Sequence, residues 1–280
     1  MKSVKDLRTF IKSSYSTEHF YKSMNLAFEK YYGQYLMLHF PFFKNASDDL
    51  EQSQKNLTHH CISKLPGITG KNVLEIGCGN GIQSMYLHQK FDPLHLTGID
   101  INEYSISIAQ NEVKKRSLQN IAFFVDNSQE LNNIADNSMD IVVNIESAFH
   151  YPDKEKFIQQ VNRVLKPGGA FVIADITNRK KREKEKPARW NRGMNLHHWT
   201  DGEYRETFSK NNFVLSSYED ITIRIIDGFR TYRNWNVKNN SLNFFQRMMV
   251  KIFLLINVRV NIYLFSKKRN YFVYSGLKAA

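Results

Sequence analysis

The sequence predicts an α/β fold built on a mostly parallel, doubly wound sheet. Apolar segments of strand length alternate with segments whose apolar residues recur at helical spacing. A glycine-rich turn, Gly77-Cys78-Gly79-Asn80-Gly81, joins the first such strand to the first such helix. Glycines let the backbone turn tightly and approach a ligand, and a helix N-terminus favours charge-dense groups. The pattern indicates a nucleotide-type site at the carboxyl ends of the strands.

The predicted elements alternate along the middle of the chain. The strands are expected at Asn72–Cys78, His95–Ile101, Ile121–Val125, Met139–Ile145 and Ala170–Ile176. The helices are expected at Ile82–Phe91, Glu103–Ser117, Lys154–Leu165 and Glu203–Lys210. Pro167-Gly168-Gly169 is the stop signal for the third of these helices.

Composition is typical of a globular cytoplasmic protein. The 280 residues are 42% hydrophobic, and no linker rich in proline or serine divides them. Cys61 and Cys78 have no metal-ligand spacing and fit a reduced compartment better than a disulfide framework, and the charged N-terminus opens no signal-peptide core. The net charge of +12 favours nucleic acid, an anionic membrane or an anionic substrate, or it reflects only a solvated basic surface.

Polar side chains follow two of the predicted strands. Asp100 ends the second strand, where a carboxylate can accept hydrogen bonds from ribose hydroxyls; a helix N-cap is the alternative role. Asp126 and Asn127 end the third strand, where they can read an adenine ring or simply form a turn. These positions converge on one edge of a parallel sheet.

The run Glu75-Ile76-Gly77-Cys78-Gly79-Asn80-Gly81 resembles the first motif of class I S-adenosylmethionine (SAM) dependent methyltransferases. Ser138–Asn144 and Val164–Ile173 resemble the fourth-strand motif and the fifth-strand region of the same family. The resemblance implies a Rossmann-like core of seven strands, with Asn212–Ile221 as the sixth strand and Tyr271–Leu277 as the last. It also implies SAM as cofactor, S-adenosylhomocysteine as product and no metal. The cofactor contacts that it implies are Glu75, Gly77, Cys78 and Gly79 toward methionine, Asp100 and Ile101 toward ribose and adenine, Asp126 and Asn127 toward adenine, and Asn144 toward the sulfonium.

The stretch Glu146-Ser147-Ala148-Phe149-His150-Tyr151-Pro152 resembles small-molecule methyltransferases that act on sterols, phenolic lipids and quinones. His150 is the candidate general base for an oxygen nucleophile, and a histidine that only shapes the pocket is the open alternative. The residues expected to line the acceptor pocket are Tyr151, Trp190, His197 and His198. O-methylation of a lipophilic or aromatic small molecule by direct displacement is favoured, with carbon and nitrogen acceptors open. A phosphorylated acceptor bound by the basic run after Asn178, RNA, and a non-catalytic SAM-binding scaffold are the alternatives, although no RNA-binding motif is present.

The segments outside the core are expected to cover the acceptor. The sequence divides into an N-terminal helical lid (residues 1–66), the core (67–226), a helical cap insertion (227–268) and the last core strand (269–280). Leu242–Phe265 is mostly apolar but carries Arg247, Lys251 and Arg259, so a cap helix is favoured over an interfacial membrane helix or a dimer contact. Val258–Leu264 alternates in polarity and also fits a strand. Peripheral contact with an anionic membrane and a homodimer are therefore further expectations.

Overall fold

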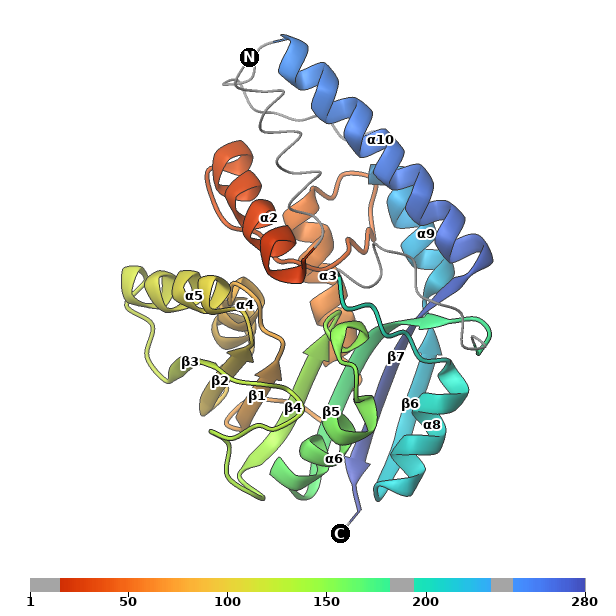
Figure 1. The fold of residues 1–280 in the computed structure, drawn as a ribbon. Coiled ribbons are helices and arrows are strands. Elements are labelled where there is room, and N and C mark those ends of the chain that lie inside the picture. The colour runs from red at the N-terminus through yellow and green to blue at the C-terminus, as the bar shows by residue number, and fades with distance from the viewer. Residues whose placement is uncertain (1–15, 182–193, 233–243, 280) are drawn as a thin grey trace.

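The computed structural model describes residues 16–181, 194–232 and 244–279, and these build one seven-stranded sheet. The strand order is β3-β2-β1-β4-β5-β7-β6, and β7 runs in the direction opposite to the other six strands (Figure 1). The strands are β1 (Asn72–Ile76), β2 (His95–Asp100), β3 (Ile121–Val125), β4 (Met139–Ile145), β5 (Leu165–Asn178), β6 (Phe213–Asp220) and β7 (Arg269–Lys278). The predicted α/β fold with a mostly parallel sheet is confirmed.

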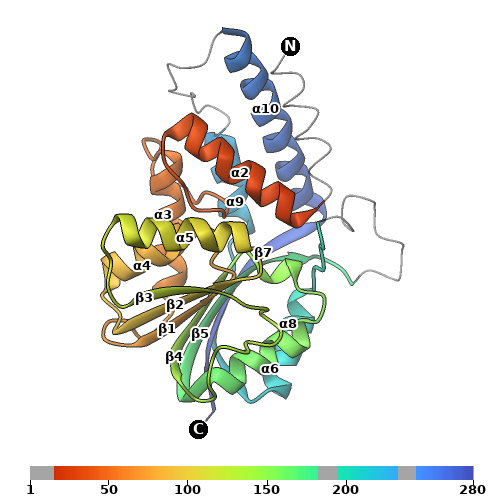
Figure 2. The ribbon, with the colours of Figure 1, turned by 60° about the vertical axis from the view of Figure 1, so that its left-hand side comes forward.

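Helices cover both faces of the sheet (Figure 2). One face carries α3 (Leu50–Ile62), α4 (Ile82–Phe91) and α5 (Glu103–Lys115), and the other carries α6 (Lys154–Val164) and α8 (Asp201–Lys210). Because successive side chains of a strand point to opposite faces, Phe171 packs with α6 and α8 while Val172 packs with the α3 side. A strand buried on both faces needs a continuous apolar run, which is why β4 and β5 are readable from the sequence.

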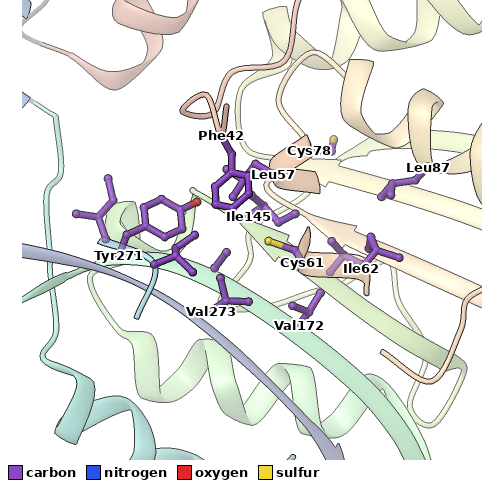
Figure 3. Close-up of a cluster of buried hydrophobic side chains, with 14 of the residues drawn as sticks. Phe42, Leu57, Cys61, Ile62, Cys78, Leu87, Ile145, Val172, Tyr271 and Val273 are labelled. Carbon is purple, nitrogen blue, oxygen red and sulfur yellow. The ribbon is translucent and has the colours of Figure 1, made fainter. Parts of the chain in front are cut away.

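The core on the α3 side is continuous from the glycine turn to the last strand. Figure 3 shows Leu57 and Cys61 of α3 beside Val172 of β5 and Val273 of β7. Cys61 and Cys78 are both buried free thiols. This packing holds the carboxyl ends of the central strands in fixed positions.

The turn before β5 differs from the expected one. Helix α6 ends at Val164, and β5 begins at once, so Pro167-Gly168-Gly169 lies inside the strand. The pairing of β4 with β5 shifts register here, because Met139 lies opposite Leu165 whereas Ile141 lies opposite Ala170. The extra residues bulge out of the ladder instead of forming a separate loop.

Three helices lie outside the core layers. Helix α2 (Thr17–Tyr32) lies beside α5, begins at the N-cap Ser16 and ends at Gly33 in the left-handed region. Helices α9 (Thr222–Tyr232) and α10 (Phe244–Lys267) follow β6 and precede β7 in the sequence, and they pack on each other. Helix α10 is continuous, so of the two alternatives left open at Val258–Leu264 the helix is present and the strand is not. No helix among the described residues has the length and apolar character needed to span a bilayer.

Candidate functional site

A cavity of about 770 Å³ lies at the carboxyl ends of β1, β2 and β4. Its size is that of a small-molecule site. Core loops form its floor, while the first turns of α2 and the loop Met37–His39 contribute to its outer wall. The sequence-predicted residues that line it are Glu75, Gly77, Cys78, Gly79, Asp100, Ile101, Asp126, Asn127, His150 and Tyr151.

Only glycine fits at the first position of the turn after β1. Gly77 has φ +73°, and a Cβ there would lie 2.2 Å from the Ser147 Oγ and 2.8 Å from the Tyr151 hydroxyl. The Gly77 and Cys78 N–H groups both donate to the Ile99 carbonyl, at 2.8 and 2.9 Å. The turn is thereby held against β2 and brought next to the loop after β4.

Asp100 links the glycine turn to the next helix. Its Oδ2 accepts from the Gly79 N–H at 2.9 Å, and its Oδ1 accepts from the Asn102 N–H at 2.8 Å. The N-cap of α5 is Asn102 and not Asp100, which removes the alternative role. Burial raises the pKa of the Asp100 carboxyl, and these backbone hydrogen bonds oppose the rise. Each carboxylate oxygen keeps acceptor capacity for a ligand hydroxyl.

The Asp126 carboxylate accepts its hydrogen bonds from the loop that follows it. Its oxygens accept from the backbone N–H groups of Asn127, Asn132 and Asn133 and from the Asn133 side chain, at 2.7 to 3.3 Å. Asn127 in turn accepts from the Gln129 N–H. The turn-forming role is therefore present, and the contact with an adenine amino group stays a prediction. Beside this loop, Ile101 is 70% exposed and offers an apolar surface at the cavity edge.

Glu75 and Asn144 are both buried, Glu75 at the cavity lining and Asn144 beneath it. Glu75 accepts from the Gln83 side chain at 2.5 Å and from the Ser84 hydroxyl, and burial raises its pKa to about 7. Asn144 is fully buried and is not among the lining residues, unlike the sequence expectation. Its Nδ2 donates to the Ile76 carbonyl at 2.9 Å and to the Ser147 Oγ at 2.6 Å, so it fixes Ser147 from below.

His150 is held on both ring nitrogens. Its Nδ1 lies 2.8 Å from the Met194 carbonyl, which can only accept, so Nδ1 carries the proton. Its Nε2 therefore accepts from the Tyr21 hydroxyl at 2.9 Å. Burial lowers the pKa of His150 to about 4, so the ring is neutral at physiological pH. Tyr21, on α2, lines the same cavity and is a site residue that the sequence analysis missed.

Glu146 is a second missed residue. It is buried at the cavity wall with φ +54°, and its Oε1 accepts from the Phe40 N–H at 2.8 Å and the Tyr271 hydroxyl at 2.9 Å. Burial raises its pKa to about 8, so the carboxyl is mostly protonated at pH 7. An acid at the end of an otherwise apolar strand was the signal available in the sequence.

His197 and His198, which were predicted to line the acceptor pocket, do not line the cavity. The His197 N–H donates to the Phe149 carbonyl at 2.7 Å, and His198 Nδ1 donates to the Ile176 carbonyl at 2.8 Å. His197 thereby fastens the segment after Met194 to the loop that carries His150, and His198 fastens it to β5. Trp190 lies outside the described residues. Among the described residues, no group of three or more histidine, cysteine or acidic side chains is arranged to hold a metal ion.

The helical insertion does not cover the cavity directly. No lining residue comes from α9 or α10, so the expected cap over the acceptor is not seen in the described part of the chain. Phe229 of α9 and Phe265 of α10 pack against Phe40 with ring centroids 5.0 and 5.8 Å away. Since the Phe40 N–H holds Glu146, the insertion supports the cavity wall from outside.

Comparisons with known proteins agree on the fold and the family. The family described as "Methyltransferase domain" matches residues 69–220, more than half of the chain. The chain is 34% identical over 131 residues to a phthiotriol/phenolphthiotriol dimycocerosates methyltransferase of Mycobacterium tuberculosis, covering 47% of each. It is 34% identical over 133 residues to a fatty-acid O-methyltransferase of Mycolicibacterium smegmatis, covering 48% of this chain and 47% of that one. The chain thus matches about half the length of these relatives.

The structure of phosphoethanolamine N-methyltransferase 2 of Haemonchus contortus with S-adenosyl-L-methionine has a TM-score of 0.77 at 18% identity, covering 94% of this chain and 58% of that one.

Proposed function

Since the chain belongs to the methyltransferase-domain family, we propose that it is a SAM-dependent methyltransferase acting on a small lipophilic acceptor, with oxygen as the favoured nucleophile. One observation carries the proposal. The glycine turn and Asp100 share a single cavity with the polar groups of Tyr21, Glu146 and His150. Their shared cavity supports a nucleoside site and an acceptor site within reach of each other.

The residues present fit the cofactor. Asp100 keeps acceptor capacity for ribose hydroxyls while its backbone partners fix its position. Gly77 leaves the floor open where any side chain would collide with Ser147, and the exposed Ile101 offers an apolar face to an adenine ring. The cofactor supplies an electrophilic methyl group on a sulfonium sulfur, and its transfer to the acceptor leaves S-adenosylhomocysteine.

Alignment is the main task of the acceptor side, because methyl transfer is an in-line displacement. A histidine with a pKa of about 4 is a poor base for a phenol of pKa about 10, since that proton transfer is unfavourable by roughly a million-fold. We therefore assign His150 to orienting the acceptor together with Tyr21, and not to removing its proton. A protonated Glu146 can donate a hydrogen bond from Oε2, because Oε1 already accepts two.

A carboxylate acceptor suits these groups best. It is already ionised at neutral pH and needs no general base, and protonated Glu146 can donate a hydrogen bond to it from Oε2, whereas the single proton of the Tyr21 hydroxyl is held by His150. The name of the M. smegmatis relative, a fatty-acid O-methyltransferase, supports this acceptor class. Phenolic hydroxyls remain within the proposal, as do carbon and nitrogen acceptors.

A phosphorylated acceptor is the second candidate, because the similar H. contortus structure is a phosphoethanolamine N-methyltransferase. The basic run expected to bind a phosphate continues into residues 182–193, which lie outside the described part of the chain. No specific observation favours RNA as the methyl acceptor or a role as a non-catalytic SAM-binding scaffold. A cytoplasmic location, a homodimer and contact with an anionic membrane are also proposals.

Isothermal titration with SAM and a methyl-transfer assay test the proposal together. Asp100→Asn should weaken SAM binding at least about tenfold, because one charge-assisted acceptor of the ribose becomes a neutral amide. Asp227→Asn, on the exposed surface of α9, is the matched control. Wild-type enzyme should methylate a long-chain fatty acid or a phenolic lipid and not phosphoethanolamine. Unchanged SAM affinity in Asp100→Asn would contradict the cofactor placement, and transfer to phosphoethanolamine alone would contradict the acceptor class.

A further inference from the structure

Helix α10 exposes a ridge of large apolar side chains. Met248, Ile252, Ile256, Val260 and Tyr263, together called the α10 ridge, are each 40 to 58% exposed. Their spacing of four, four, four and three residues places them on one side of the helix. Exposed apolar surface that is contiguous in this way marks an interaction site more often than scattered single residues do.

The ridge points away from the body of the protein. Val258 and Phe265 are buried at 1% and 2% exposure in the core on the α9 side, and at 100° per residue they fall on the side of the helix opposite the ridge. Figure 1 shows α10 at the outer edge of the molecule, extending beyond the sheet. The helix is therefore apolar on its packed side and on its exposed side.

The charges of α10 all have one sign. The helix contains no aspartate or glutamate, and Lys251, Arg259 and Lys267 are exposed on it, followed by the exposed Lys268. By helical position Arg259 and Lys267 fall within the arc of the ridge itself. Two copies meeting through this surface would bring like charges together, which disfavours self-association. Anionic lipid headgroups are complementary to it, and the ridge can enter the acyl boundary between them.

We infer that α10 is a peripheral docking helix for the surface of an anionic phospholipid bilayer. It lies on the membrane and does not cross it, in line with its charges. The final turns of α10 contact Phe40 through Phe265, and Phe40 holds Glu146 at the cavity wall. Docking through α10 would therefore place the membrane beside the elements that support the acceptor site. The inference concerns binding alone and does not depend on methyl transfer.

Vesicle flotation with the full chain tests the inference. The wild-type protein should float with vesicles of phosphatidylcholine mixed with phosphatidylglycerol and stay behind with phosphatidylcholine alone, and added salt should weaken the binding. Ile256→Glu should lower partitioning at least about tenfold, because it removes buried apolar area and adds a negative charge near anionic lipid. Arg259→Gln should lower it about fivefold.

Val214→Glu is the matched control, because Val214 is 61% exposed on β6, away from α10. It should bind vesicles as the wild type does. Melting curves check that each variant is folded, and sedimentation velocity reports association between copies. Equal binding to neutral and anionic vesicles, or partitioning unaffected by Ile256→Glu, would overturn the inference. So would a wild-type dimer that Ile256→Glu dissociates in the absence of any vesicle binding.

Discussion

The Tyr21 hydroxyl donates a hydrogen bond to His150 Nε2 at 2.9 Å, joining the first turns of α2 to the loop after β4. The rings also meet edge to face, with centroids 5.6 Å apart. Burial, with Glu146 and Asp100 nearby, raises the pKa of Tyr21 well above its usual value, so the hydroxyl stays a donor. This pair crosses the cavity and ties the N-terminal helix to the core.

The first prediction concerns this pair. Tyr21→Phe removes the hydrogen bond but keeps the ring, so stability should fall by only about 1 kcal/mol. Amide hydrogen exchange in α2 should accelerate, and kcat/KM should fall as the outer wall of the cavity loosens. A double-mutant cycle with His150→Phe should give a coupling energy of about 1 kcal/mol. Tyr218→Phe, on the exposed part of β6, is the control; a coupling near zero would show that the contact is not formed in solution.

The second prediction separates alignment from base catalysis. With a pKa of about 4, His150 stays neutral from about pH 5 upward, so the pH profile of kcat/KM should show no imidazole inflection between pH 6 and 7. His150→Gln keeps a hydrogen-bonding side chain and should retain turnover to within about tenfold. A loss of 10²-fold or more, the range typical of a removed general base, would restore the base assignment.

The third prediction is a pH dependence of stability caused by Glu146. Its folded pKa of about 8 lies above the unfolded value near 4.5, so between these pH values the folded state holds a proton that the unfolded state has lost. The free energy of unfolding contributed by this group therefore falls as pH rises from about 4.5 to 8. Glu146→Gln should remove that contribution and raise the melting temperature at pH 8 more than at pH 5. An equal change at both pH values would mean that Glu146 is ionised in the folded protein.

The fourth prediction compares two glycines with nearly the same positive φ. Gly77 and Gly168 have φ +73° and +74°, but an added Cβ would collide with Ser147 at Gly77 and meet nothing within 4 Å at Gly168. Gly168→Ala should cost only the conformational strain, about 1 to 2 kcal/mol. Gly77→Ala should cost more and abolish SAM binding by calorimetry. Ser147→Gly added to Gly77→Ala should restore part of the stability; equal costs at the two glycines would argue against the close approach.

Local periodicity was enough to place most core elements. Helix α4 and strands β3 and β4 have the predicted bounds, because apolar residues recur at helical spacing in α4, dominate β3 and β4, and are bounded by strong breakers. The same reasoning left helix and strand open at Val258–Leu264, where alternation of a few residues occurs inside a long helix. A short pattern cannot distinguish a strand from a helix that is apolar on two sides.

The sequence by itself determined the sheet, the glycine turn and the position of Asp100 at a strand end, since these depend on residues close together in the chain. Only the tertiary structure decided that Tyr21 meets His150, that Glu146 is buried and protonated, that His197 and His198 do not line the cavity, and that α10 supports the wall and exposes a ridge. The physical reason is that burial and hydrogen-bond partners set protonation and orientation. For His150 and Glu146 those partners include Tyr21 and Tyr271, which lie more than a hundred residues away along the chain, and no local pattern relates such segments.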